Sequence, residues 1–102
     1  VLKSKDIKSK YIFINTKHNN KSLYINIKDN GGGIDENIID KIFEPYFTTY
    51  HQSQGKGLGL YTVKIMLERY LNSIISVDNE NFIYNENRYK GAIFKINLNI
   101  DN

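Results

Sequence analysis

The sequence predicts an α+β fold in which a sheet is covered by helices on one face. Runs typical of strands lie toward both ends of the chain, and helical periodicity is confined to its middle. Strands and helices that are segregated in this way bury their apolar faces against each other as a two-layer α/β sandwich. The chain has 102 residues, 40% of them hydrophobic and 25% charged. We therefore expect residues 1–102 to form a single small globular domain.

Alternating side chains identify the strands. In residues 23–27, apolar Leu23, Ile25 and Ile27 alternate with other residues, which is the period of a half-buried strand. Residues 11–14 are aromatic and β-branched, and a turn between these two runs predicts a hairpin. Further strands are predicted in the C-terminal third, at residues 74–77 and 94–100, with the polar residues 78–90 as a wide connection.

Two helices are predicted in the middle of the chain. A short helix begins at residues 35–37, where two acidic side chains favour a helix start, and Pro45 ends it. A longer helix begins at about Leu58, and Asn72 is suited to the left-handed conformation that follows a helix. The apolar face of the longer helix is predicted from residues three or four apart: Leu60, Val63, Leu67 and Tyr70.

Composition excludes several classes of function. The chain has no cysteine, so it has neither a disulfide framework nor a thiolate metal site. Its formal charge is +3, but the basic residues are too dispersed for a nucleic-acid-binding surface, and we expect no nucleic-acid partner. No apolar run is long enough to span a membrane, and no signal peptide is visible. We therefore expect a cytoplasmic location, although the parent protein can still be anchored in a membrane.

The first segment with functional chemistry follows the strand of residues 23–27 and reads Asp29-Asn30-Gly31-Gly32-Gly33-Ile34. A carboxylate accepts hydrogen bonds and donates none at neutral pH, so Asp29 suits a ligand edge that carries an amino group, such as that of adenine. Glycines allow the backbone to come close to such a base. The alternative is an Asx-type turn whose glycines serve only the conformation of the chain itself.

The second segment reads Gly55-Lys56-Gly57-Leu58-Gly59-Leu60 and begins the longer helix. Free backbone N–H groups at a helix N-terminus attract phosphate, and Lys56 adds a positive charge. The alternative is a flexible loop before the helix. The segment does not match a dinucleotide-binding fingerprint, because it follows a polar loop instead of a strand, and it lacks the Gly-Lys-Ser/Thr ending of a P-loop.

A third motif, Phe43-Glu44-Pro45-Tyr46-Phe47-Thr48-Thr49, lies between the two glycine segments. On its own it is either a packed aromatic corner or, with the mobile loop expected at residues 46–54, a lid over bound phosphates. In this order and spacing, the three motifs resemble the ATP-binding domain of sensor histidine kinases, which belongs to the superfamily of gyrase, the ninety-kilodalton chaperones and the mismatch-repair ATPases. The resemblance covers about residues 1–100, and the third motif is most similar to the nitrogen-regulation branch of these kinases.

The resemblance implies the Bergerat ATP-binding fold, with a mixed sheet, and a role for individual residues. Asp29 would bind the adenine amino group. Gly31 and Gly33 would shape the base pocket, with Ile34 packed near it. The lid and the phosphate cradle, together with two leucines that seat the helix in the core, would supply the other residues: Phe43, Phe47, Thr48, Gly55, Lys56, Gly57, Leu58, Gly59 and Leu60.

The chain departs from the family in ways that bear on its activity. The asparagine motif that holds Mg²⁺ in the family is absent, and we expect it upstream, on a helix whose last turn is residues 1–5. The fold is therefore expected to be N-terminally truncated, with an exposed apolar surface at which two copies can form a homodimer. No phospho-acceptor histidine with its family surroundings is present, because His18 lies in a turn and His51 in the lid. We expect neither a metal ligand nor a catalytic residue within the chain.

The sequence thus favours the ATP-binding part of a two-component sensor histidine kinase, which is expected to be inactive by itself. Its cofactors would be ATP and Mg²⁺. It would position ATP for phosphoryl transfer to a histidine on another domain of the same protein. That histidine would pass the phosphoryl group to a response regulator. Two alternatives stay open: another ATPase or a serine kinase of the superfamily, and a docking module without nucleotide. The sequence upstream of this chain would distinguish a histidine kinase from another ATPase or a serine kinase of the superfamily. A change of melting temperature on addition of nucleotide would exclude the docking module.

Overall fold

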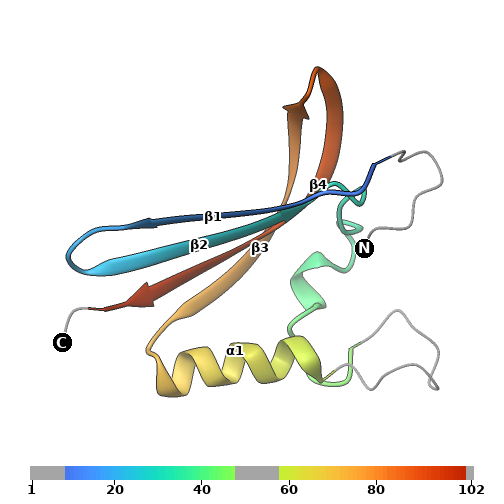
Figure 1. Ribbon diagram of the computed structural model, residues 1–102. Helices are drawn as coiled ribbons and strands as arrows, with labels where there is room; N and C mark the ends of the chain where they lie inside the picture. The colour runs from blue at the N-terminus through green and yellow to red at the C-terminus, as the bar shows by residue number, and fades with distance from the viewer. Residues whose placement is uncertain (1–8, 48–57, 101–102) are drawn as a thin grey trace.

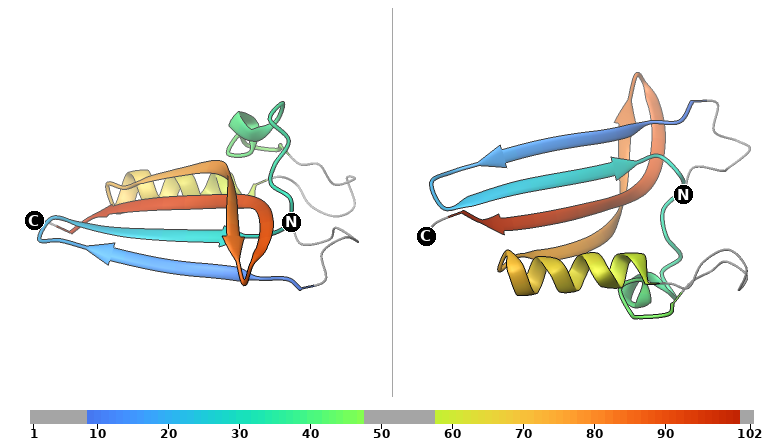
Figure 2. Two further views of the ribbon diagram at one scale, coloured as in Figure 1. Left: turned by 90° about the horizontal axis from the view of Figure 1, so that it is seen from above. Right: turned by 60° about the horizontal axis from the view of Figure 1, so that its bottom comes forward.

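The computed structural model describes residues 9–47 and 58–100, in which one sheet carries its helices on a single face (Figure 1 and Figure 2). This arrangement agrees with the predicted α+β sandwich. The helix end predicted at residues 1–5 and most of the predicted lid lie outside the described residues. The elements are, in chain order, β1 Ile12–His18, β2 Ser22–Asp29, the 3-10 helix η1 Ile39–Lys41, α1 Gly59–Tyr70, β3 Ile74–Tyr84 and β4 Asn87–Asn99.

The strands form a sheet in the order β1-β2-β4-β3. The predicted hairpin of β1 and β2 is confirmed, and Asn19 forms its turn by accepting hydrogen bonds from the N–H groups of Lys21 and Ser22. All neighbouring pairs are antiparallel in the part of the chain that the structure describes. The parallel pair of the predicted mixed sheet is not found there, because β4 lies between β2 and β3 and runs antiparallel to both.

The wide connection predicted at residues 78–90 is wrong. The strands β3 and β4 stay paired along the whole of residues 74–84, and only Asn85 and Glu86 form the turn. Both turn residues have positive φ, 50° and 67°, as a two-residue turn of type I′ requires. Polar composition hid these strands, because most side chains near the tip of the hairpin are exposed and need no apolar partner.

An aromatic cluster packs where the far half of the β3–β4 hairpin bends away from the rest of the sheet (Figure 1). The cluster consists of Tyr11, Phe13, Phe82, Tyr84 and Tyr89. Its neighbouring ring centroids lie 4.9–6.0 Å apart, mostly edge to face. Lys28 of β2 places Nζ 4.1 Å from the ring centroid of Phe82 and 2.9 Å from Oε1 of Glu80. These contacts join the bent hairpin to β1 and β2.

Helix α1 begins and ends close to its predicted limits, and Asn72 has the expected left-handed conformation, with φ of 50°. Its predicted apolar face is only partly correct. Val63 and Tyr70 of this face are 42% and 75% exposed, whereas Lys64 and Ile65 are half-buried. The helix is therefore rotated from the predicted orientation, with Lys64 on its buried side. A lysine can lie there because its alkyl chain covers apolar surface while its charged end stays in water.

An aromatic contact packs the described chain that follows β2 against the sheet. Phe43 packs edge-on against Phe94 of β4, with ring centroids 6.3 Å apart. The short helix predicted from residues 35–37 is reduced to the three residues of η1. The carboxylate of Asp35 accepts the N–H of Asn37 at 2.8 Å, and this local side-chain turn competes with a regular first helical turn.

The register of β2 against β4 depends on Gly91, and we expect Gly91→Ala to lower the free energy of unfolding by roughly 3 kcal/mol. A Cβ at this position would overlap the carbonyl oxygen of Asp29, so the strands would have to move apart. Urea unfolding measures the loss. The matched control is Gly59→Ala, where no described atom lies within 4 Å of the added carbon. Equal unfolding free energies for the two variants would contradict the close approach of the strands.

Candidate functional site

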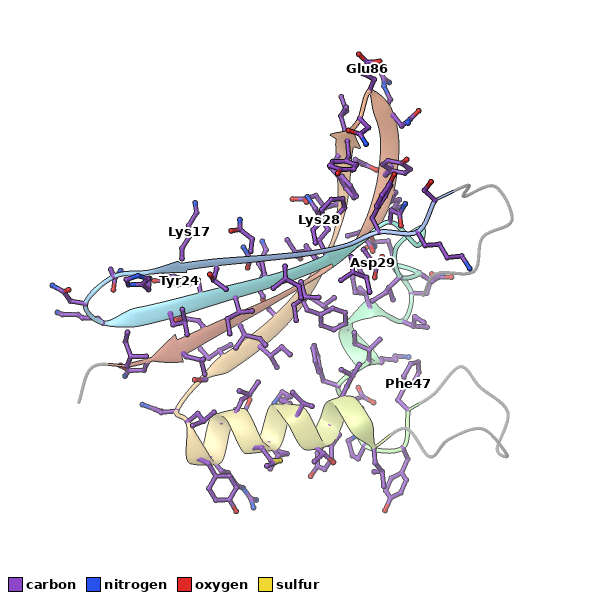
Figure 3. The ribbon with its side chains drawn as sticks, viewed as in Figure 1. Lys17, Tyr24, Lys28, Asp29, Phe47 and Glu86 are labelled. Atoms are coloured by element: carbon purple, nitrogen blue, oxygen red, sulfur yellow. The ribbon has the colours of Figure 1, made fainter. Side chains whose placement is uncertain are left out.

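Asp29, labelled in Figure 3, is the last residue of β2, and two backbone amides hold its side chain. Its Oδ1 accepts hydrogen bonds from the N–H of Gly31 at 2.9 Å and from the N–H of Ala92 at 3.2 Å. Its Oδ2 accepts none from the described residues. Because one oxygen is fixed by the fold, the other is held in a defined direction and can accept a hydrogen bond from a ligand.

Gly91 brings the backbone of β4 close enough for this contact. The glycine is buried, and any side chain there would overlap the main chain at Asp29. The sequence analysis did not single out Gly91 or Ala92. The available signal was a glycine within the run before the final strand, which marks a close approach of another backbone.

The glycine segment after Asp29 has positive φ at two of its three glycines. Gly32 and Gly33 have φ of 97° and 88°, which side chains rarely adopt. Gly31 has no positive φ, and its role in this structure is to donate its N–H to Asp29. The N–H of Gly32 donates to the carbonyl oxygen of Lys90 at 2.8 Å, so β4 holds the glycine segment as well as the carboxylate.

Asn79 of β3 holds the far end of the same segment. Its Oδ1 accepts the N–H of Ile34 at 2.7 Å, and its Nδ2 donates to the carbonyl oxygen of Ile34 at 2.7 Å. The same Nδ2 also donates to Oε2 of Glu36 at 2.7 Å. The sequence analysis missed this residue because it assigned residues 78–90 to a connection.

Asn30 ties the segment to the start of β1. It is only 1% exposed, and its Oδ1 accepts the N–H of Tyr11 at 2.9 Å, while its Nδ2 donates to the carbonyl oxygen of Ser9 at 2.8 Å. A buried amide whose donor and acceptor are both satisfied fixes the local backbone firmly. Residues 29–34 are thus attached to β1, β3 and β4, and the base-side residues predicted from the sequence form one continuous, anchored loop.

The predicted phosphate side is described only from Leu58 onward. Leu58 caps α1 without a side-chain hydrogen bond, and its carbonyl oxygen accepts the N–H of Thr62 at 2.9 Å. Leu60 is half-buried, as expected for a residue that seats the helix, whereas Gly59 is exposed. The remaining residues predicted for this side, Thr48, Gly55, Lys56 and Gly57, lie outside the described residues.

The two described halves of the predicted site lie at the same end of the molecule. The last residues of β2 and the first residues of α1 lie toward the same side of the molecule in both views of Figure 2. Phe47, half-buried, lies near the start of α1 (Figure 3). This placement brings a fixed carboxylate, a glycine-rich backbone and the free N–H groups of a helix start to one end of the sheet.

The described ranges, 9–47 and 58–100, contain neither a cluster of metal ligands nor a membrane-spanning helix. No group of three or more histidine, aspartate or glutamate side chains there could hold a metal ion. No helix in these ranges is long and apolar enough to cross a membrane.

Comparison with known protein sequences gives relatives of much greater length. The chain is 35% identical over 74 residues to the two-component sensor PprA of Pseudomonas aeruginosa, which covers 72% of this chain and 7% of that protein. It is 31% identical over 90 residues to sporulation kinase B of Bacillus subtilis, which covers 88% of this chain and 19% of that protein. The chain therefore spans less than a fifth of these curated relatives.

The fold is similar to solved catalytic domains. The catalytic domain of histidine kinase ThkA, in a nucleotide-free form, superposes with a TM-score of 0.72 at 23% identity, over 93% of this chain and 56% of that one. The mycobacterial sensor histidine kinase MprB superposes with a TM-score of 0.69 at 22% identity, over 88% of this chain and 59% of that one. These likenesses confirm the predicted fold class.

The profile of the family described as histidine kinase-, DNA gyrase B-, and HSP90-like ATPase matches residues 2–102, which is nearly the whole chain. The match agrees with the three motifs and with the fold. The chain belongs to this ATPase family.

Proposed function

We propose that this chain is the ATP-binding part of a two-component sensor histidine kinase. The observation that carries the proposal is the carboxylate of Asp29, whose Oδ1 is held by two amides while its Oδ2 has no donor among the described residues. Family membership supports the same assignment, and so do a two-component sensor and a sporulation kinase among the relatives.

The adenine ring is proposed to lie against residues 29–34. The amino group of adenine would donate to Oδ2 of Asp29, and the positive φ of Gly32 and Gly33 keeps side chains away from this stretch of backbone. Gly31 and Ile34 complete the proposed contact with the base. Since an amino group can only donate and an ionised carboxylate can only accept, the pair selects adenine over a purine that carries a carbonyl in that position.

The phosphates are proposed to lie at the start of α1, a position that the exposed Gly59 leaves open. Backbone N–H groups in a first helical turn lack partners within the helix and attract anions. The family resemblance assigns Gly55, Lys56 and Gly57 to the same cradle. It also assigns Phe47 and Thr48 to a lid over the phosphates, and these roles remain part of the proposal.

The proposed reaction is phosphoryl transfer to a histidine on another domain of the same protein. A ring nitrogen of that histidine forms a bond to the γ-phosphorus, the bond from phosphorus to the β–γ bridging oxygen breaks, and ADP leaves. The contribution of this chain is to position ATP, which is the larger part of catalysis in such transfers. Mg²⁺ would neutralise phosphate charge, and we propose that its asparagine ligand precedes Val1 in the complete protein.

The wider setting follows from the same proposal. The phosphorylated histidine would pass its phosphoryl group to a response regulator, as in other two-component systems. The wording of residues 43–49 supports the nitrogen-regulation branch, and we propose a cytoplasmic location for this part of the protein. Ile12 and Ile14 of β1 are exposed, which supports an apolar surface that a neighbouring segment or a second copy covers.

Replacing the carboxylate of Asp29 by an amide tests the adenine contact. We expect Asp29→Asn to weaken ATP binding by about 1–3 kcal/mol, since the amide would turn an N–H toward the donor of the base. Stability should change little, because the amide oxygen still accepts the N–H groups of Gly31 and Ala92. Isothermal titration of the complete protein with ATP provides the affinity.

The matched control is Asp35→Asn, an exposed site in the same loop with the same change of charge. It should leave ATP affinity unaltered, because an amide oxygen can still accept the N–H of Asn37. Identical ATP affinities of the parent protein and Asp29→Asn would show that the adenine contact is assigned incorrectly.

A substitution at Gly59 separates stability from binding. We expect Gly59→Ala to stabilise the fold by about 0.5–1 kcal/mol, because alanine is the better helix former and nothing described lies near the added carbon. ATP affinity should fall several-fold at the same time, since the methyl group hinders approach of phosphate to the helix start. Thermal unfolding and ATP titration measure the two effects.

The control is Thr62→Ala, which improves helix propensity at an exposed position further along α1. It should raise stability and leave affinity unchanged. A Gly59→Ala protein that binds ATP as tightly as the parent would argue against phosphates at this helix start.

A further inference from the structure

Two residues of the β3–β4 hairpin that face each other across the strands hold the ends of the proposed nucleotide loop. Asn79 of β3 is paired in register with Ala92 of β4. Ala92 donates its N–H to the carboxylate of Asp29, and Asn79 binds both polar groups of the Ile34 backbone. One rung of the hairpin therefore holds both ends of residues 29–34.

The side chain of Asn79 is suited to this task because a primary amide carries both a donor and an acceptor. Its Oδ1 satisfies the N–H of Ile34, and its Nδ2 is shared between the carbonyl oxygen of Ile34 and Oε2 of Glu36, each contact 2.7 Å long. A carboxylate could make only the first of these contacts. A hydroxyl group is shorter and has a single hydrogen to donate.

The amide of Asn79 fits beside Gly33 because the glycine has no side chain. A Cβ at Gly33 would lie 2.7 Å from Oδ1 of Asn79 and 3.3 Å from Cε of Lys90, and the φ of Gly33 is 88°. Lys90 in turn accepts the N–H of Gly32 through its carbonyl oxygen. The positive φ of the glycines and the hairpin contacts thus depend on each other, and loss of the amide would free the loop to change conformation.

We propose that Asn79 is a positioning residue for the nucleotide: its amide fixes the conformation of residues 31–34, and thereby the surface against which the base of ATP lies. This inference rests on the proposed function, because it assumes that Asp29 and the following glycines bind ATP. Asn79 itself is not assigned a contact with the ligand. Its effect passes through the backbone of Ile34 and the position of Gly33.

The sharpest test is Asn79→Asp, which keeps the shape of the side chain, replaces its donor by a second acceptor and adds a negative charge. The ionised carboxylate would face the carbonyl oxygen of Ile34 and the carboxylate of Glu36, which repel it. At pH 8 we expect ATP to bind about tenfold more weakly than to the parent protein. Near pH 5 the introduced carboxyl begins to take up a proton and regains a donor, so the difference should shrink.

Each measurement is a ratio of dissociation constants, variant to parent, obtained by titration of the complete protein with ATP. Among the described residues, the contacts of Asn79 and of its partner Ala92 bring the charged side chains of Asp29, Glu36 and Lys90 near this position, and ATP is charged as well. Because these groups are common to both proteins, the ratio removes most of their effect. A role in stability alone would not make the ratio for ATP depend on pH in the folded protein.

The matched control is Asn81→Asp, on the same strand and the same face, two residues further along β3. Asn81 is exposed, and the substitution adds the same charge without removing a contact of the loop. Its ratio should stay near one at both pH values. Adding Glu36→Gln to Asn79→Asp should recover affinity at pH 8, because the new amide can donate to the introduced carboxylate.

The results distinguish this inference from the proposed function. Equal ratios for Asn79→Asp and Asn81→Asp, with Asp29→Asn still weakening ATP, would overturn the role of Asn79 alone. Absence of ATP binding by the parent protein, or an unchanged affinity of Asp29→Asn, would instead overturn the proposed function, and with it the basis of this inference. If Asn79→Asp fails to fold, Asn79→Ser takes its place. It should weaken ATP several-fold and speed hydrogen exchange at residues 31–34, and parent-like values of both would overturn the role.

Discussion

The close approach of β4 to the end of β2 is the constraint on which the rest of the site depends. It exists because Gly91 has no side chain, so the backbone of β4 can lie directly against Asp29. From this approach follow the hydrogen bond from Ala92 to the carboxylate and the one from Gly32 to Lys90. A carboxylate at a strand end would otherwise turn freely in water, and its free oxygen would have no fixed direction.

The long β3–β4 hairpin links this constraint to the rest of the fold. Midway along the hairpin, Asn79 and Ala92 hold the loop that follows β2. Farther out, the aromatic cluster and the cation of Lys28 join the hairpin to β1 and β2. Since few apolar side chains are fully buried among the described residues, these polar and aromatic contacts carry an unusually large share of the organisation of the sheet.

Local patterns were sufficient to predict the elements that are themselves local. Strand alternation identified β2, helical periodicity identified α1, and the left-handed Asn72 followed from its place after the helix. The motifs around Asp29 located the candidate site, because they lie in one continuous segment. The family resemblance and the match to the family agree on this assignment.

The features that escaped prediction depend on contacts between distant parts of the chain. Asn79 and Gly91 acquire their roles only when the hairpin lies beside residues 29–34. No repeating pattern of residues in the sequence predicts that contact. The orientation of α1 likewise follows from the sheet beneath it.

The free oxygen of Asp29 is proposed to accept the amino group of adenine, and a ligand altered at that group alone tests this contact. The complete protein is titrated with ATP and with the analogue that lacks only the 6-amino group. We expect the analogue to bind more weakly by roughly 1–3 kcal/mol, or about 5- to 150-fold, because a buried acceptor loses its donor. Equal affinities for the two nucleotides would contradict it.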